Sequence, residues 1–278
     1  MAVVSGPPPY RDATVIQPQP DEKVGFFTDS SICIGCKACE VACKEWNHVP
    51  VDGLNFLGSS YDNTGELGAN SWRHVAFIEQ NRPVAADGSG GMRWLMNSDV
   101  CKHCAHAACL EVCPTGALMR TEFGTVVVQP DVCNGCGYCV SACPFGVIER
   151  REGDGRAFKC TLCYDRLKGQ MQPACAQACP TQSIQFGPID DLRARARRRL
   201  ADLEQQGVAD ARLYGVDETD NEVGGLHAFF LLLDKPEVYG LPAHPVTTTR
   251  DLRQMWRTAA AAAGMLALGV LAAFVKRR

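Results

Sequence analysis

The sequence predicts an α+β protein built from two small cysteine-rich modules and one C-terminal transmembrane helix. Two observations predict this fold. The chain has 278 residues and 16 cysteines, and these cysteines gather in four short runs separated by strand-like segments. Residues 258–275 then form an uncharged stretch that is followed by Lys276, Arg277 and Arg278.

Composition excludes some classes of protein. The hydrophobic content of 46% and the charged content of 21% are ordinary for a folded domain. The net charge of −3 and the lack of a long basic block give no reason to expect a nucleic-acid partner. A protein of this length can build a core, so its cysteines are not needed as the disulfide scaffold of a short secreted protein.

The cysteines repeat in a regular way. Each run contains four of them, and three of the runs end in Cys-Pro. The spacings are Cys33-x2-Cys36-x2-Cys39-x3-Cys43, Cys101-x2-Cys104-x4-Cys109-x3-Cys113, Cys133-x2-Cys136-x2-Cys139-x3-Cys143 and Cys160-x2-Cys163-x11-Cys175-x3-Cys179.

This spacing suits iron–sulfur chemistry. A loop with two residues between cysteines wraps three thiolates around one cubane, and the fourth cysteine, one helical turn onward, ligates the other cluster of a two-cluster ferredoxin. Gly35, Gly135 and Gly137 relieve the crowding in such loops. The runs therefore predict bacterial-ferredoxin-like modules with two [4Fe–4S] clusters each, four in all, with all sixteen cysteines as ligands.

Other uses of the cysteines fit less well. A structural zinc site needs four ligands as two separated pairs, which a three-cysteine run with an offset fourth does not offer. His103 and His106 lie inside the second run, where they are expected to pack or to hydrogen-bond near a cluster. Spacing alone does not decide whether the second run pairs with the third or the third with the fourth.

Several hairpins are expected between the runs. The cysteine-free insertion contains strands at 72–79 and 92–96, joined by a turn at 88–91. Shorter hairpins are expected at 117–120 with 125–129, around Gly124, and at 147–150 with 156–159.

A helix is predicted from Asp190, as its N-cap, to Gly207. Its apolar residues recur at helical spacing, namely Leu192, Ala196, Leu200 and Leu203. Its five arginines are interpreted as a solvated face, with an acidic partner as the alternative: Arg193, Arg195, Arg197, Arg198 and Arg199.

The uncharged stretch 258–275 has the length of a membrane span, since 18 residues of helix cover about 27 Å of a hydrocarbon core about 30 Å thick. Small residues spaced four apart offer a surface for close packing on another membrane helix: Ala260 with Gly264 and Gly269 with Ala273. A buried Ala-rich soluble helix is the alternative. Basic residues flank both ends, so the orientation stays open.

The motifs carry a resemblance. The segments 33–39, 136–145 and 160–166 resemble the iron–sulfur subunits of the molybdopterin oxidoreductase superfamily. Five other features are more specific, and they resemble the beta subunit of membrane-bound formate dehydrogenase: Ser-Tyr-Asp-Asn (60–63), Ser-Trp (71–72), Val-Gly-Gly-Leu-His (223–227), Tyr-Gly-Leu-Pro (239–242) and the single C-terminal anchor. The likeness runs from about residue 26 to the C-terminus.

The resemblance implies a nested pairing of the runs. It assigns Cys33, Cys36, Cys39 and Cys179 to cluster 1, Cys43, Cys160, Cys163 and Cys175 to cluster 2, Cys101, Cys104, Cys109 and Cys143 to cluster 3, and Cys113, Cys133, Cys136 and Cys139 to cluster 4. Module A then comprises 26–43 with 158–189, and module B comprises 99–157. The other parts are an extended arm (1–25), an insertion (44–98), a helix and partner-contact region (190–250) and the anchor (251–278).

The resemblance also implies a role. The chain would relay single electrons from a molybdenum- or tungsten-bis-pterin catalytic alpha subunit to a membrane cytochrome b gamma subunit and quinone, with no catalytic residue of its own. The lipid bilayer would hold residues 258–275, with the remainder on the periplasmic side, although the residues themselves leave the cytoplasmic side open. The alternatives are a subunit of a reductase for dimethyl sulfoxide, thiosulfate, polysulfide or tetrathionate, a free polyferredoxin, or a zinc-rich interaction module.

Overall fold

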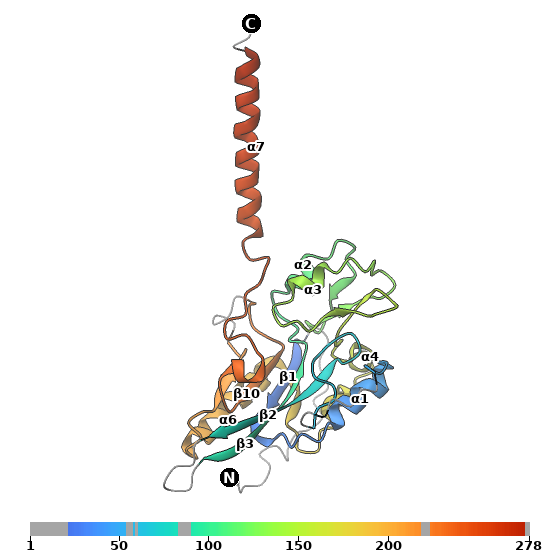
Figure 1. Cartoon of the computed structure of the whole chain (residues 1–278), viewed down its shortest axis with the longest axis vertical. Coiled ribbons are helices and arrows are strands. Elements are labelled where there is room, and N and C mark those ends of the chain that lie inside the picture. Colours follow the sequence, from blue (N-terminus) through green and yellow to red (C-terminus); the bar gives the residue numbers. More distant parts are fainter. Residues whose placement is uncertain (1–21, 54–57, 59–60, 83–89, 218–222, 276–278) are drawn as a thin grey trace.

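The fold was analysed in a computed structural model, which describes residues 22–53, 58, 61–82, 90–217 and 223–275. Figure 1 shows a globular part from which a long C-terminal helix projects. The extended arm expected at 1–25 lies almost wholly outside the described residues. Its last two residues, however, belong to the first strand, β1 (Val24–Asp29).

A mixed four-stranded sheet, in the order β8-β1-β10-β9, forms the centre of the globular part. β1 pairs in parallel with β10 (Ala228–Leu232) and antiparallel with β8 (Ile184–Pro188), and β10 pairs antiparallel with β9 (Arg212–Tyr214). This sheet was not predicted from the sequence. Its central parallel pair joins segments some two hundred residues apart, so no local turn signal announces it.

Both faces of the sheet are covered, so all six residues of β1 are buried. Phe27 belongs to one apolar cluster, together with the helix that follows β8. Phe26 belongs to a second cluster that also contains Cys39, Cys160 and Cys175. Successive side chains of a strand point to opposite faces, which explains why these neighbouring phenylalanines serve different cores.

The predicted helix is present as α6 (Ile189–Gln205), and Leu192, Ala196 and Leu203 are buried on its inner face. Two details of the prediction were wrong. Pro188 occupies the N-cap, and Asp190 lies in the first turn, where it pairs with Arg193. Arg199 is buried rather than solvated, because it pairs with a carboxylate on the sheet.

The insertion forms the predicted hairpin, with strands longer than expected: β2 (Arg73–Arg82) and β3 (Gly91–Val100) pair along their whole length. Half of the predicted 88–91 turn, residues 88 and 89, lies outside the described residues, and Gly91 is already the first residue of β3. The two shorter hairpins are also present, as β4 (Leu118–Arg120) with β5 (Val126–Val128) and β6 (Glu149–Arg150) with β7 (Ala157–Phe158).

Short helices accompany the cysteine runs: α1 (Ala38–Asn47), α2 (Ala108–Glu111), α3 (Tyr138–Ala142), α4 (Tyr164–Lys168) and α5 (Ala174–Gln177). α1 packs against α5, and α2 packs against α3. Elements from the first and fourth runs thus lie together, as do elements from the second and third. Two single turns, η1 (Ser30–Ile32) and η2 (Pro236–Tyr239), complete the globular part.

The C-terminal helix α7 (Leu252–Val275) begins six residues before the uncharged stretch. Its most apolar window has a mean hydropathy of 2.1, and none of that window is buried against the remainder of the protein. The helix is long and apolar enough to cross a membrane, and the exposure of its side chains counts against the alternative of a buried soluble helix. In Figure 1 it leaves the globular part beside α2 and α3, away from α1 and α4.

Candidate iron–sulfur cluster sites

Each run places its cysteines on a tight loop and the helix that follows it. In the first run the loop turns at Gly35 and Lys37, both with positive φ, and α1 then carries Cys39 and Cys43. In the third run Gly135 and Gly137 have φ of 73° and 79°, which confirms the backbone role expected of the glycines. None of the sixteen cysteines forms a disulfide.

The thiols of the first and fourth runs come together. Burial first, and then Cys39 and Cys179, raise the pKa of Cys33 to about 11. Cys43 interacts with Cys160, Cys175 and Cys163, and its pKa lies well above the ordinary value, chiefly because of burial. These interactions link thiols that are more than a hundred residues apart in the sequence, such as Cys33 with Cys179 and Cys43 with Cys160.

The second and third runs interleave in the same manner. Burial and the neighbouring thiols of Cys101, Cys143 and Cys109 raise the pKa of Cys104 well above its ordinary value. Burial likewise raises the pKa of Cys139 to about 11, with contributions from Cys133, Cys136 and Cys113.

We name these sets group 1 (Cys33, Cys36, Cys39, Cys179), group 2 (Cys43, Cys160, Cys163, Cys175), group 3 (Cys101, Cys104, Cys109, Cys143) and group 4 (Cys113, Cys133, Cys136, Cys139). Cys36 is placed in group 1 by its position in the first run. It is exposed and follows Gly35 in the first loop.

Successive groups also approach one another. Cys39 of group 1 interacts with Cys175 of group 2. Cys160 of group 2 interacts with Cys101 of group 3. Cys109 of group 3 interacts with Cys139 of group 4. The four groups therefore follow one another in a row.

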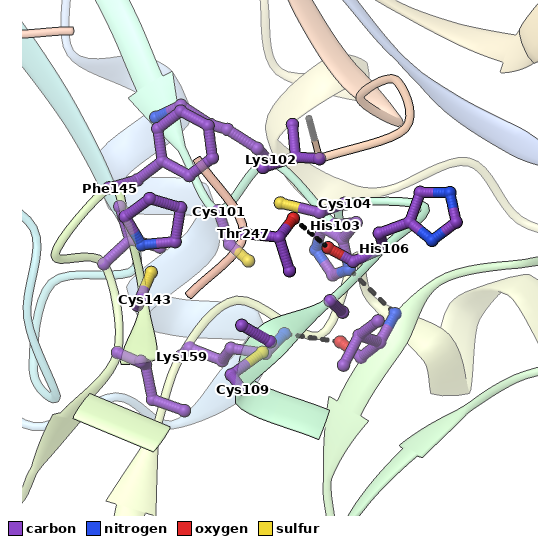
Figure 2. Close-up of a pocket in the computed structure, with 17 residues that line it drawn as sticks. Cys101, Lys102, His103, Cys104, His106, Cys109, Cys143, Phe145, Lys159 and Thr247 are labelled. Atoms are coloured by element: carbon purple, nitrogen blue, oxygen red, sulfur yellow. Dashed lines mark hydrogen bonds between the residues drawn. The ribbon is translucent and has the colours of Figure 1, made fainter. Parts of the chain in front are cut away.

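Group 3 surrounds a cavity, which Figure 2 shows in detail. All four of its cysteines line the space, together with apolar residues that include Phe145. His103 also lines it, and its Nδ1 accepts a hydrogen bond of 3.1 Å from the backbone N–H of Val126. The Nε2 atom of His103 is buried and has no partner among the described residues. This ring is neutral, since burial and then Lys159 hold its pKa well below the usual range.

These observations fit a bound cluster. Burial raises the pKa values of Cys104, Cys109 and Cys143 around this cavity, because it disfavours the thiolate. Iron would hold them as thiolates, and the spare N–H of His103 is a donor for a sulfide or thiolate sulfur. Among the described residues, no three or more His, Cys, Asp or Glu side chains converge closely enough to hold a single metal ion.

Buried cations accompany the thiols. Arg73 at the start of β2 is only 2% exposed, and its Nη1 donates to the backbone oxygen of Ser98 at 3.2 Å. Lys159 is equally buried and donates to the backbone oxygen of Cys160 at 2.9 Å. Lys102, fully buried, pairs with Asp99 at 2.5 Å. Sequence reasoning missed all three, since isolated basic residues carry no motif.

Residues that follow α6 in the sequence line one side of the group 3 cavity. The backbone oxygens of Val223 and Gly225 accept hydrogen bonds from His106 and Ala105 at 2.8 and 3.1 Å. Further along, Thr247 lines the cavity, and Figure 2 shows its side chain among the cysteines. The Val-Gly-Gly-Leu-His motif thus holds the second run in place. His106 packs against Gly224, close to where a Cβ would stand, which is the packing role predicted for it.

Comparison with known families agrees with this chemistry. Residues 92–189 and residues 32–117 each match a 4Fe-4S dicluster domain. The chain is thus an iron–sulfur protein with two dicluster ferredoxin-like domains and one candidate membrane helix, and its cofactors are [4Fe–4S] clusters.

Curated relatives define the family. The formate dehydrogenase iron-sulfur subunit of Haemophilus influenzae is 39% identical, over 91% of this chain and 80% of the relative. The nitrate-inducible formate dehydrogenase iron-sulfur subunit of Escherichia coli is 38% identical, over 88% and 81%. The B subunit of the anaerobic dimethyl sulfoxide reductase of Escherichia coli is also 38% identical, but over 62% and 76%. This chain therefore belongs to the family of formate dehydrogenase iron–sulfur subunits.

Proposed function

We propose that this chain relays single electrons through four [4Fe–4S] clusters within a membrane-bound formate dehydrogenase complex. The observation that carries the proposal is the row of four cysteine groups, in which each group approaches the next. Formate oxidation releases two electrons together, whereas a [4Fe–4S] cluster carries one electron at a time. A row of one-electron sites converts the pair into a sequence of single transfers.

The proposed ligand sets are the nested ones, with group 1 for cluster 1 and so on to group 4 for cluster 4. They are supported by the mutual effects of the thiols within each group on their pKa values. Nested pairing joins the first run with the fourth and the second with the third, whereas the spacing of the cysteines also allowed the third run to pair with the fourth.

We propose that electrons enter at group 1 and leave from group 4. The catalytic partner would be a molybdenum- or tungsten-bis-pterin alpha subunit docked near α1, and the acceptor a cytochrome b gamma subunit in the membrane. Two features support this direction: α2 and α3, which carry ligands of the second and third runs, lie beside the start of α7, and α1 lies away from it. The protein's own side chains orient clusters and exclude water, and catalysis belongs to the partner.

The resemblance to formate dehydrogenase beta subunits supports placing the globular part on the periplasmic side of the membrane. Protease treatment of intact spheroplasts tests this proposal. Cleavage of the globular part without lysis is expected, whereas complete protection would put it on the cytoplasmic side.

Two alternatives are less well supported. A reductase subunit for dimethyl sulfoxide would share the cluster core equally, since the identity is similar in both comparisons. The alignment to formate dehydrogenase subunits, however, extends over about nine-tenths of the chain, against 62% for the dimethyl sulfoxide reductase subunit. A free polyferredoxin has no use for the apolar helix α7.

The test of function is isolation of the native complex from membranes, followed by subunit identification and addition of formate. We expect a large pterin-containing partner, about sixteen irons per copy of this chain and the appearance of reduced-cluster signals in electron paramagnetic resonance. Reduction by another donor but not by formate would overturn the proposal.

Pairs of substitutions test the ligand sets. Replacing Cys33 and Cys179 together by alanine removes two ligands of one proposed cluster, so three cluster signals should remain. Replacing Cys33 and Cys175 together removes one ligand from each of two clusters, so at least two signals should change or vanish. The nested pairing is wrong if Cys33→Ala with Cys179→Ala disturbs two clusters.

A further inference from the structure

Arg73 is a buried charge without a carboxylate partner in the described part of the protein. Its Nη1 donates to the backbone oxygen and the Oγ of Ser98, at 3.2 and 3.1 Å. Its Nε and Nη2 atoms are buried and find no nitrogen or oxygen acceptor among the described residues. Its guanidinium carbon lies 4.8 Å from the centroid of the Phe26 ring. The positive charge is thus held in an apolar setting and is not neutralised locally.

The groups that Arg73 faces are thiols of two different groups. Phe26, over whose ring Arg73 lies, packs in one cluster with Cys39, Cys160 and Cys175. The guanidinium interacts with these three thiols and with Cys43. Cys39 belongs to group 1 and the other three to group 2. Arg73 also hydrogen-bonds the side chain of Cys175. The guanidinium therefore lies at the junction of the first two groups.

Lys159 occupies the next junction in the same way. It is 2% exposed, and its ammonium donates to the backbone oxygens of Cys160 and Val126. Its side chain lines the cavity of group 3 together with Cys101 and Cys109, and it hydrogen-bonds the side chain of Cys101. Cys160 is in group 2, and Cys101 and Cys109 are in group 3.

Group 4 differs from the others. The cations near it in the described residues are solvent-accessible arginines: Arg156, which interacts with Cys133 but is already paired with Asp154 at 2.6 Å, and Arg150, which donates to the backbone oxygen of Gly135 at 3.3 Å. Water screens charges at the surface, whereas a buried charge acts through a medium of low dielectric constant.

We propose that Arg73 and Lys159 are fixed positive charges shared by neighbouring clusters, and that they raise the reduction potentials of clusters 1, 2 and 3 relative to cluster 4. Arg73 serves clusters 1 and 2, and Lys159 serves clusters 2 and 3. This inference rests on the proposed ligand sets. Each one-electron reduction adds one negative charge within reach of these side chains, so they stabilise the reduced form more than the oxidised one. A shared charge also moves two potentials together, which keeps neighbouring sites matched for electron transfer.

The test is a redox titration of the purified complex, followed by electron paramagnetic resonance, for the variants Arg73→Met and Lys159→Met. Each variant should lower two of the four midpoint potentials. One cluster should shift in both variants, because group 2 contacts both cations, and one cluster should shift in neither. This pattern can be recognised without assigning any signal to a particular cluster.

Two further variants separate charge from structure. Arg73→Lys keeps the charge and should keep the potentials close to those of the unaltered protein. Arg93→Met removes a cation from the same hairpin whose partners are the backbone oxygen of Leu233 and the carboxylates of Asp210 and Asp234, so all four potentials should stay unchanged. Equal shifts of all four potentials, or none in variants that retain their iron, would overturn the inference.

Failure of the inference can be told apart from failure of the proposed function. If the unaltered protein shows fewer than four cluster signals, the proposed assignment of four ligand sets is wrong. If four signals are present and their potentials do not change in Arg73→Met or Lys159→Met, the proposed role of the cations is wrong, whereas the ligand sets are unaffected. If Arg73→Met loses iron, Lys159→Met decides by itself: two lowered potentials support the inference and four unchanged ones contradict it.

Discussion

Arg199 on α6 and Asp29 at the end of β1 form a buried ion pair, with Nε 3.0 Å from Oδ2 and with side-chain exposures of 5% and 0%. The other carboxylate oxygen of Asp29 accepts hydrogen bonds from the backbone N–H and the hydroxyl of Ser31, just before the first cysteine run. The pair thus ties the helix after the fourth run to the strand before the first.

Breaking this pair should destabilise the protein strongly. Arg199→Met removes the guanidinium that pairs with the buried carboxylate of Asp29, and breaking a buried ion pair by removing one partner costs about 3–5 kcal/mol. Thermal unfolding of the purified complex, followed by bleaching of its visible absorbance, measures the effect. Arg197→Met is the matched control, because its partner Asp217 is 47% exposed, and a cost of less than about 1 kcal/mol is expected. Similar melting temperatures for both variants would contradict this account.

Gly135→Ala should abolish the cluster of group 4. Gly135 has φ of 73°, and a Cβ there would stand 2.6 Å from the backbone oxygen of Gly155, which cannot move aside as a side chain would. Iron should fall by about four per chain. Gly155→Ala is the control, because its φ of 81° carries the same strain but no described atom lies within 4 Å of the new Cβ. Loss of iron in the control alone would refute the steric explanation.

Acid should weaken the fold through His227. Burial lowers the pKa of this side chain to about 4, and its Nδ1 lies 3.0 Å from the backbone oxygen of Val24. The unfolded chain, with a histidine pKa of about 6.5, binds the proton more readily than the folded one. The contribution to stability is therefore complete above about pH 6.5 and is lost as the pH falls towards about 4. At about pH 5 the loss is about 2 kcal/mol. His227→Gln should flatten the dependence of the melting temperature on pH in this window; an unaltered slope would rule this origin out.

A charge in the middle of α7 should impair membrane insertion. Leu268→Arg places a guanidinium in a helix of which none is buried by the remainder of the protein, at a cost of about 2.5–3.5 kcal/mol at the centre of a bilayer. Less of the protein should then stay in the membrane after extraction at high pH. Met255→Arg is the control, since it adds a charge near Arg253 and Arg257 at the helix start. Membrane retention equal to that of the control would argue against a transmembrane role.

Local signals predicted the parts of the protein that depend on local chemistry. Spacing between cysteines predicted iron–sulfur clusters, turn residues predicted the three hairpins, and the periodicity of Leu192, Ala196 and Leu203 predicted α6. The N-cap was misplaced because Asp190 has the right chemistry for a cap, whereas the geometry at the end of β8 gives that position to Pro188. Arg199 was misread as solvated because nothing near it in the sequence reveals Asp29.

Residue types and their spacing alone determined that this protein binds iron–sulfur clusters and carries an apolar C-terminal helix, because thiolate loops and the length of a membrane span are local properties. Only the tertiary structure decided which thiols meet, that β1 lies between β8 and β10, and that Arg73 and Lys159 lie at the junctions between cysteine groups. These relationships join residues far apart in the sequence, and they arise from the packing of two apolar cores against opposite faces of one sheet.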